Sequence, residues 1–294
     1  MPDSVSKLVV GSANFGMNYG LTNRFGKITQ LELKSILFEA KVGGVKFIDT
    51  AQAYGNSEAR IGALCNDGHF EVITKIDVDL ENACPTNSVY SLVKQSCQKL
   101  NQSRLYAVLL HRPEVLLGCH GKMIIKELQT LKEQNIISKV GVSIYSPEIL
   151  GEILKLMQLD IVQAPFNIFD QQILSSGWAN KLRDSGTEIH TRSGFLQGLL
   201  LMQQPVLPAY FYNRWPYLFN TWFDFLNRSG NHALTAALTF ALKQQWVDKV
   251  VVGVDSALQL KSLIKVERSS VSIDFPQLAC DDPELINPSR WRLN

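Results

Sequence analysis

Eight short apolar runs, rich in Val and Ile, alternate with longer segments of helical period along the 294-residue chain. Strands that are buried on both faces have such continuous apolar sequences, and their alternation with helices indicates a parallel sheet. Eight strand–helix units most often close into a barrel. We therefore expect an α/β fold, a single (β/α)8 TIM barrel. The expected strands are 7–11, 45–49, 71–76, 105–111, 138–143, 160–165, 188–193 and 249–254.

Amphipathic segments between these runs are the expected helices. They cover 29–44, 86–100, 122–135, 146–158 and 231–245. Thr29 and Ser146 are placed to act as N-caps. Two segments exceed the barrel plan, an extended aromatic loop after the seventh strand (202–230) and a C-terminal tail from about residue 266. No repeat, linker or low-complexity stretch divides the chain, so we expect one domain over residues 1–294.

The net charge of +2 without a long basic run gives little support to nucleic-acid binding. No apolar stretch approaches the roughly 18 residues of a membrane helix, and the N-terminus lacks a signal-peptide pattern. The cysteines are odd in number and lack C-x-x-C and metal-ligand spacing, so we expect reduced thiols, no metal and a cytoplasmic location. They are Cys65, Cys84, Cys97, Cys119 and Cys280.

Polar side chains stand at the ends of three consecutive expected strands. Asp49 ends the second strand, Lys75 lies near the end of the third, and His111 ends the fourth. Tyr54 lies in the loop just beyond the second strand. Because the chemistry of (β/α)8 barrels sits at the C-terminal ends of the strands, we expect these four groups to meet at one mouth.

Such a cluster can deliver a proton to an oxygen atom. A phenol has a pKa of about 10, and a nearby cation lowers the pKa of such a group by roughly 1–3 units. Lys75, paired with Asp49, could tune Tyr54 in this way, and general acid catalysis contributes roughly 10²–10⁴-fold to a rate. His111 would orient and polarise the group that is protonated.

Each of these residues has a structural explanation when it is taken alone. Asp49 could cap a helix or form a surface ion pair, and Tyr54 could be a turn residue. Lys75 could simply be the polar residue at which a strand ends, and His111 could be a loop histidine. Only their joint position at consecutive strand ends favours a functional role.

Other polar and aromatic segments have explanations that do not involve chemistry. Asn56, Ser57 and Glu58 are expected to cap the helix after Tyr54. In the aromatic loop, the spacing of apolar residues over 218–226 predicts a helix whose apolar face packs on the barrel. The part of the loop before this helix is better placed to contact a substrate. Trp291 in the tail is a further candidate for the mouth.

These residues and motifs resemble those of the aldo-keto reductases. The resemblance covers about residues 7 to 265 and rests on "FIDTAQAYGNSEARIG", "ITK", "LLHRP", "VGVS", "VQAPFNIFD" and the "GLL" after the seventh strand. The catalytic set of the family falls on Asp49, Tyr54, Lys75 and His111. The resemblance implies hydride transfer from a nicotinamide cofactor to an aldehyde or ketone, with Tyr54 as the general acid.

The resemblance also implies where the cofactor is held, without a Rossmann fingerprint. The implied cofactor-binding residues are Ser143, Gln163, Arg192, Ser193, Asp255, Ser256 and Gln259. Ile144 stands where the family often has an asparagine. Arg192 stands where it often has a tyrosine stacked on the nicotinamide, and a guanidinium can stack in the same way. We hypothesise that such a stack tolerates the reduced cofactor better than the oxidised one.

The choice between the two nicotinamide cofactors stays open. Family habit slightly favours NADP(H), whereas Asp255 stands where a basic residue often meets the 2′-phosphate. A carboxylate there repels a phosphate and can accept hydrogen bonds from a ribose hydroxyl, which favours NAD(H).

The partner that the resemblance implies is a small carbonyl compound. The aromatic loop and "RSGFLQGLL" point to a sugar-like substrate. One alternative is a non-catalytic barrel that binds the cofactor and regulates a partner. Another is an isomerase or lyase that uses Lys75 as a Schiff base.

Overall fold

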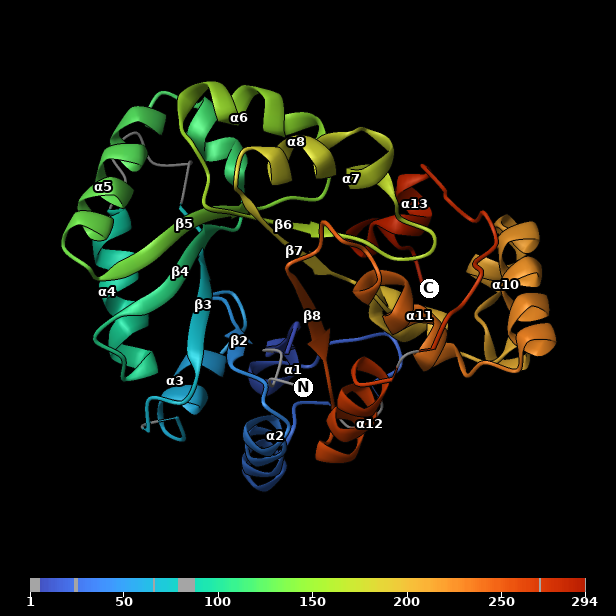
Figure 1. The fold of residues 1–294 in the computed structure, drawn as a ribbon. Coiled ribbons are helices and arrows are strands. Elements are labelled where there is room, and N and C mark those ends of the chain that lie inside the picture. The colour runs from blue at the N-terminus through green and yellow to red at the C-terminus, as the bar shows by residue number, and fades with distance from the viewer. Residues whose placement is uncertain (1–5, 24–25, 66, 79–87, 270, 294) are drawn as a thin grey trace.

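Eight parallel strands form the centre of the molecule and close into a barrel in chain order, with β8 hydrogen-bonded to β1 (Figure 1). The predicted (β/α)8 barrel is confirmed. The strands are β1 (Leu8–Gly11), β2 (Phe47–Asp49), β3 (Glu71–Ile76), β4 (Leu105–Leu110), β5 (Ile137–Ser143), β6 (Ile161–Pro165), β7 (Glu188–Arg192) and β8 (Lys249–Gly253). The computed structural model describes residues 6–23, 26–65, 67–78, 88–269 and 271–293.

Helices surround the barrel and cover the outward faces of the strands (Figure 1). The α-helices are α1 (Ala13–Gly16), α2 (Gln30–Val42), α3 (Ser57–Gly62), α4 (Val89–Leu100), α5 (Gly121–Glu133), α6 (Leu150–Leu156), α7 (Gln172–Ser175), α8 (Trp178–Asp184), α9 (Ala209–Arg214), α10 (Pro216–Ser229), α11 (Ala233–Leu242), α12 (Ala257–Glu267) and α13 (Pro283–Ile286). The 3₁₀ turns are η1 (Pro113–Leu117), η2 (Pro147–Ile149), η3 (Leu196–Leu201), η4 (Gln204–Val206) and η5 (Pro288–Arg290).

The expected elements are present close to their predicted bounds. All eight strands form, and the five expected helices correspond to α2, α4, α5, α11 and the pair η2–α6. Thr29 caps α2 by accepting a hydrogen bond from the Glu32 N–H at 3.1 Å. Ser146 caps η2 with a longer bond from the Glu148 N–H at 3.4 Å. The start of the predicted segment 86–100 lies outside the described residues.

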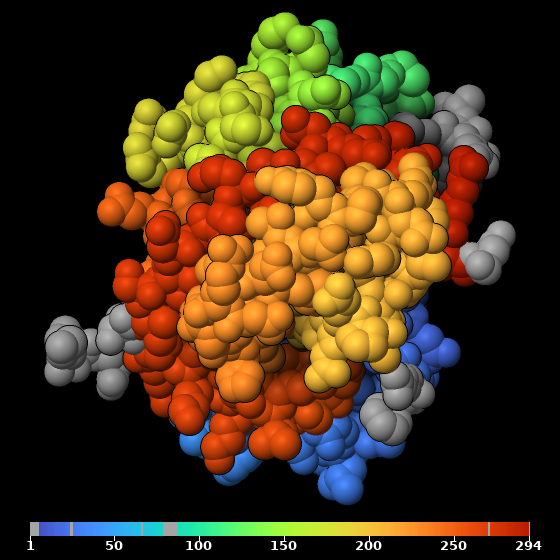
Figure 2. Space-filling model, turned by 90° about the vertical axis from the view of Figure 1, so that its right-hand side faces the viewer, coloured from blue at the N-terminus to red at the C-terminus, as the bar shows by residue number. Residues whose placement is uncertain are grey.

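The segment after β7 and the C-terminal tail cover one side of the barrel together (Figure 2). Helix α10 buries Phe219, Trp222 and Phe223, which confirms the predicted apolar stripe. The tail packs on the same face, because Trp291 lies 4.8 Å from Phe211, measured between ring centres. These aromatic side chains therefore form part of the hydrophobic core.

The inside of the barrel has an apolar layer with charged groups at its N-terminal end. The apolar layer consists of Val9, Phe47, Ile73, Ala107, Leu109 and Ile161. Near the starts of their strands lie Tyr106, Lys139, Glu188, His190 and Lys249, which we call the floor cluster. Parallel strands place all their starts at one end of the barrel, opposite the end where the strands finish.

Two further findings concern the described residues. Within the described ranges, the structure contains no helix that is long and apolar enough to span a bilayer. The cysteines that can be placed are free thiols, and Cys84 lies outside the described residues. The free thiols are Cys65, Cys97, Cys119 and Cys280.

Candidate active site

The structure brings Asp49 and Lys75 together at the C-terminal mouth of the barrel. Asp49 is the last residue of β2, and Lys75 lies one residue before the end of β3. The Lys75 ammonium donates a hydrogen bond to Asp49 Oδ1, and the two side chains are 1% and 3% exposed. Burying either charge without a partner would be strongly unfavourable for folding, so each residue compensates the buried charge of the other.

Tyr54 and His111 lie next to this pair. The Lys75 Nζ atom is 5.2 Å from the centre of the Tyr54 ring, within the range of a cation–π interaction. The rings of Tyr54 and His111 meet edge to face, with their centres 6.0 Å apart. No hydrogen bond joins the Tyr54 hydroxyl to any residue that the structure describes. The phenol therefore lies beside a cation with its own hydrogen-bonding capacity unused.

Two glycines, Gly16 and Gly55, allow the loop that carries Tyr54 to pack closely against the segment after β1. A Cβ on Gly16 would lie 1.8 Å from the Tyr54 carbonyl oxygen, and one on Gly55 would lie 2.4 Å from the Gly16 oxygen. Gly55 also has a φ of +58°, which glycine adopts without strain. The loop after β1 thus packs directly on the backbone that carries the tyrosine.

The helix that follows Tyr54 is held by buried polar contacts rather than by the expected caps. The prediction for Asn56 is wrong, because its side chain makes no cap hydrogen bond. Ser57 is buried and donates to the Ser12 carbonyl oxygen at 3.0 Å. Glu58 is buried as well and accepts a hydrogen bond from the Thr74 hydroxyl at 2.7 Å. These contacts fix α3 against β1 and β3, an arrangement that cap patterns do not reveal.

The surroundings set the protonation states of Lys75 and His111. Burial alone would lower the pKa of Lys75, but the charge of Asp49 and its hydrogen bond outweigh burial and raise it. Burial and the positive charge of Lys75 lower the pKa of His111 to about 4. At neutral pH, Lys75 is therefore a cation, and His111 is a neutral imidazole that can donate one N–H.

Gln163 extends the charged pair toward the expected nicotinamide position. Its Nε2 donates to Asp49 Oδ2 at 2.7 Å, while its buried Oε1 has no hydrogen-bond partner among the described residues. Ser143 lies beside it in the register of β5 and β6. An unused amide oxygen next to a hydroxyl fits a carboxamide that can both donate and accept, as the nicotinamide group does.

Arg192 also lies at the mouth, where it ends β7. Its guanidinium donates to the Ile144 carbonyl oxygen at 2.9 Å and to the Ser193 hydroxyl at 3.2 Å. It lies 4.5 Å from the centre of the Tyr145 ring. One face of the guanidinium is therefore already covered by an aromatic ring of the protein itself.

The loop after β1 crosses toward the loop after β7 and brings Tyr19 to the mouth. The Leu21 N–H donates to the Gln197 carbonyl oxygen at 3.1 Å. The withdrawal of the Tyr19 hydroxyl from water raises its pKa, and Tyr54 acts in the same direction while Arg192 opposes it. Sequence reasoning missed Tyr19 because it followed the ends of strands two, three and four and passed over strand one.

The last three predicted cofactor residues lie at the N-terminus of α12. The Ser256 hydroxyl caps this helix by accepting from the Gln259 N–H at 3.2 Å. The Gln259 side-chain oxygen accepts from the Asp255 N–H at 2.7 Å, and Asp255 Oδ1 accepts from the Asn14 amide at 2.8 Å. The Ser256 and Gln259 side chains therefore bond to backbone N–H groups of this same segment, and Asn14 is a contact that sequence reasoning missed.

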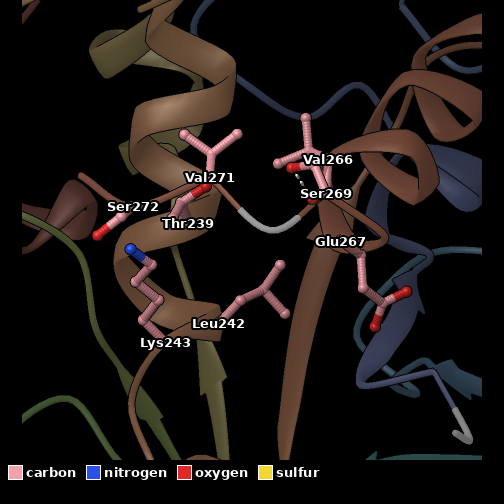
Figure 3. A pocket seen from close by; sticks show the side chains of 8 residues that line it. All are labelled: Thr239, Leu242, Lys243, Val266, Glu267, Ser269, Val271 and Ser272. Atoms are coloured by element: carbon pink, nitrogen blue, oxygen red, sulfur yellow. Dashed lines mark hydrogen bonds between the residues drawn. The ribbon is translucent and has the colours of Figure 1, made fainter. Parts of the chain in front are cut away.

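A surface hollow between α11, α12 and the tail is remote from this mouth (Figure 3). Lys243 and Glu267 are among its lining residues, and the Glu267 carboxylate accepts a hydrogen bond from the Ser6 hydroxyl at 2.7 Å, next to the start of β1. The hollow is thus at the opposite end of the barrel from Asp49 and Lys75. Among the described residues, no group of His, Cys, Asp and Glu side chains could hold a metal ion.

Comparison with known proteins identifies the family of the chain. A model of the aldo/keto reductase family matches residues 7–275. D-arabinose 1-dehydrogenase of Saccharomyces cerevisiae is 32% identical over 152 residues, which cover 48% of this chain and 44% of the yeast protein. The match thus spans less than half the length of that relative.

Two solved structures share the fold at low identity. An aldo-keto reductase from Bacillus halodurans, in its holo form, superposes with a TM-score of 0.70 at 18% identity and covers 92% of this chain and 89% of its own. For a putative aldo-keto reductase from Pseudomonas aeruginosa the TM-score is 0.65 at 19% identity, with 90% of each chain covered.

Proposed function

The chain belongs to the aldo/keto reductase family, and from this premise we propose that it reduces an aldehyde or ketone with a nicotinamide cofactor. Membership of the family supports an oxidoreductase activity. We propose that the chain acts as one domain. The observation that carries the finer proposal is the position of Tyr54 between the Lys75–Asp49 pair and His111.

Tyr54 is the proton donor of the proposed reaction. Its hydroxyl proton passes to the carbonyl oxygen of the substrate and leaves a phenolate, which the Lys75 ammonium stabilises because it lies over the ring. The neutral His111 donates an N–H to the same oxygen and holds it in position. The cofactor, when bound, supplies the hydride that the carbonyl carbon receives.

Gln163 connects the acid to the cofactor in this proposal. It holds Asp49 through one side of its amide and offers the other side to the nicotinamide carboxamide, together with Ser143. Arg192 and Ser193 would cover the ring, and Asp255, Ser256 and Gln259 would face the adenosine end. Gln163 would thus connect a bound cofactor to Asp49, the carboxylate that stabilises the positive charge of Lys75. Cofactor binding and proton donation by Tyr54 would therefore be physically connected.

A sugar-like carbonyl compound is the proposed substrate class. The yeast relative is named for D-arabinose, and Tyr19 and Tyr145 place two aromatic rings near the mouth. The aromatic loop gives less support to a sugar substrate than its sequence suggested. The Trp215 ring N–H already donates a hydrogen bond to the Asp282 carboxylate at 3.1 Å. A Schiff-base reaction on Lys75 is disfavoured, since its raised pKa keeps the amine protonated.

Replacing Tyr54 by phenylalanine tests the proposal. We expect Tyr54→Phe to lower kcat/KM for reduction of a panel of aldoses and simple aldehydes by roughly 10²–10⁴-fold, because the proton donor is lost. The decrease in NADH or NADPH absorbance measures the rate. Tyr106→Phe is the matched control, since it removes the same hydroxyl at the other end of the barrel and should leave the rate nearly unchanged.

Two results would contradict the proposal. Equal losses in both variants would mean that Tyr54 acts only through stability. Tight cofactor binding without turnover of any carbonyl compound, in the presence of intact Tyr54, would favour the non-catalytic regulatory barrel.

A further inference from the structure

The N-terminus of α12 is where a barrel of this kind most readily binds a phosphate. Phosphate sites in (β/α)8 barrels are frequently built from the loops after strands seven and eight and a helix N-terminus. Free backbone N–H groups and the helix dipole both favour an anion there. Helix α12 follows β8 directly and has eleven residues. On the proposed function, the adenosine end of the cofactor would meet this terminus.

In this chain, three backbone donors at that terminus are already occupied by side chains. The Ala257 N–H donates to Glu32 Oε1 at 2.7 Å. The Gln259 N–H donates to Ser256, and the Asp255 N–H donates to Gln259. A phosphate group that binds to the Ala257 N–H would have to displace the Glu32 carboxylate from it.

Glu32 reaches α12 from α2, the first long helix of the chain. The two helices pack side by side below the barrel in Figure 1. Glu32 is the third residue of α2, where a glutamate after an N-cap threonine usually turns back to its own helix. Here the carboxylate instead crosses to α12, and it lies close to the positive ends of two helix dipoles.

Asp255 adds a second negative charge at the same place. Its carboxylate is held by the Asn14 amide, a neutral donor. In the described ranges, neither Glu32 nor Asp255 forms an ion pair with Lys or Arg. No cation among the described residues therefore offsets either carboxylate, and carboxylates in this position repel a phosphate and can accept hydrogen bonds from ribose hydroxyls.

We propose that Glu32, together with Asp255, makes the adenosine end of this site selective for NAD(H) over NADP(H). This inference rests on the proposed function, because it assumes that a nicotinamide cofactor binds at the mouth. It opposes the family habit that slightly favours NADP(H). Glu32 is the specificity-determining residue, since its carboxylate occupies the helix N-terminus that a 2′-phosphate would require.

Equilibrium binding of NADH and NADPH, measured by quenching of tryptophan fluorescence, tests the inference without turnover. We expect the wild-type Kd for NADH to be at least about tenfold lower than that for NADPH. Glu32→Gln removes the charge and keeps an oxygen for the Ala257 N–H, so the NADPH/NADH ratio should fall several-fold, mainly through tighter NADPH binding. Glu39→Gln makes the same charge change two turns further along α2 and should leave the ratio unaltered.

The possible failures are distinguishable. If the wild-type protein binds NADPH as tightly as NADH, or if Glu32→Gln and Glu39→Gln change the ratio equally, the role of Glu32 is refuted while the proposed function stands. If neither cofactor binds at millimolar concentration, the proposed function itself fails, and the inference falls with it.

Discussion

The two ends of the barrel contain the same three chemical groups in different arrangements. At the mouth, Lys75 pairs with Asp49 and lies 5.2 Å from the Tyr54 ring centre. In the floor cluster, Lys139 pairs with Glu188 and lies 4.8 Å from the Tyr106 ring centre. A lysine, a carboxylate and a tyrosine in contact are therefore not enough to identify a site.

The hydrogen bonds of the two tyrosines distinguish the ends. The Tyr106 hydroxyl accepts from Lys139 at 2.8 Å and donates to Glu188 at 3.1 Å, so its capacity is used within the protein. The Tyr54 hydroxyl has no such partner in the described ranges. The Tyr54 hydroxyl can therefore hydrogen-bond to a ligand at the mouth without breaking a bond within the described protein, which is the reason to propose the chemistry there.

Burial also differs, and it predicts the largest effect on stability. Lys75→Met leaves Asp49 without its cation at 3% exposure, so we expect the free energy of unfolding to fall by about 3–5 kcal/mol. Lys139→Met should lower it by only about 1–2 kcal/mol, because both partners are 29% exposed and Glu188 keeps access to water. Urea unfolding of both variants measures the two values. Equal losses would mean that the two pairs are energetically alike and that burial does not separate them.

The meeting of the polar strand ends could be predicted from the sequence, because it depends only on where each strand ends and on the order of the strands. Parallel strands in a barrel bring their C-terminal ends together, so the positions of Asp49, Lys75 and His111 follow from strand order alone. Tyr54 follows from its short distance to β2. Ser143 and Gln163 were singled out by the resemblance to the family, which did not reveal the hydrogen bond from Gln163 to Asp49.

Contacts between distant parts of the chain could not be predicted in this way. Glu32 and Ala257 are 225 positions apart, and their contact exists only because barrel closure places the first long helix next to the last one of the barrel. From the local sequence alone, Glu32 is an ordinary first-turn glutamate that follows the N-cap Thr29. Likewise, Glu188 begins a strand, and no local pattern shows that it meets Tyr106, 82 positions away.

The floor cluster should contribute more to acid stability than to catalysis. Burial would raise the pKa of Glu188, but hydrogen bonds from His190 and Lys139 outweigh it and lower the pKa to about 2. A carboxyl whose folded pKa lies below its unfolded value of 4.5 stabilises the fold above that value, and the stabilisation is lost as the pH falls toward 2. Glu188→Gln should therefore lower the Tm at pH 6 and make its decline below pH 4.5 shallower. Parallel Tm–pH curves for variant and wild type would show that the floor does not control acid unfolding.

The smallest expected effect concerns His111, and it tests the mouth itself. With its pKa lowered to about 4 by burial and the Lys75 charge, His111 should stay neutral from pH 8 down to about 5. Its folded pKa lies below the ordinary 6.5, so the neutral ring stabilises the fold above pH 6.5, and this contribution is lost as the pH falls toward 4. NMR titration of the imidazole signals, assigned by loss of one signal in His111→Gln, should show no midpoint for His111 between pH 5 and 8. A midpoint near 6.5 would mean that Lys75 and burial do not act on this ring, and the mouth would then lose its neutral N–H donor at mildly acidic pH.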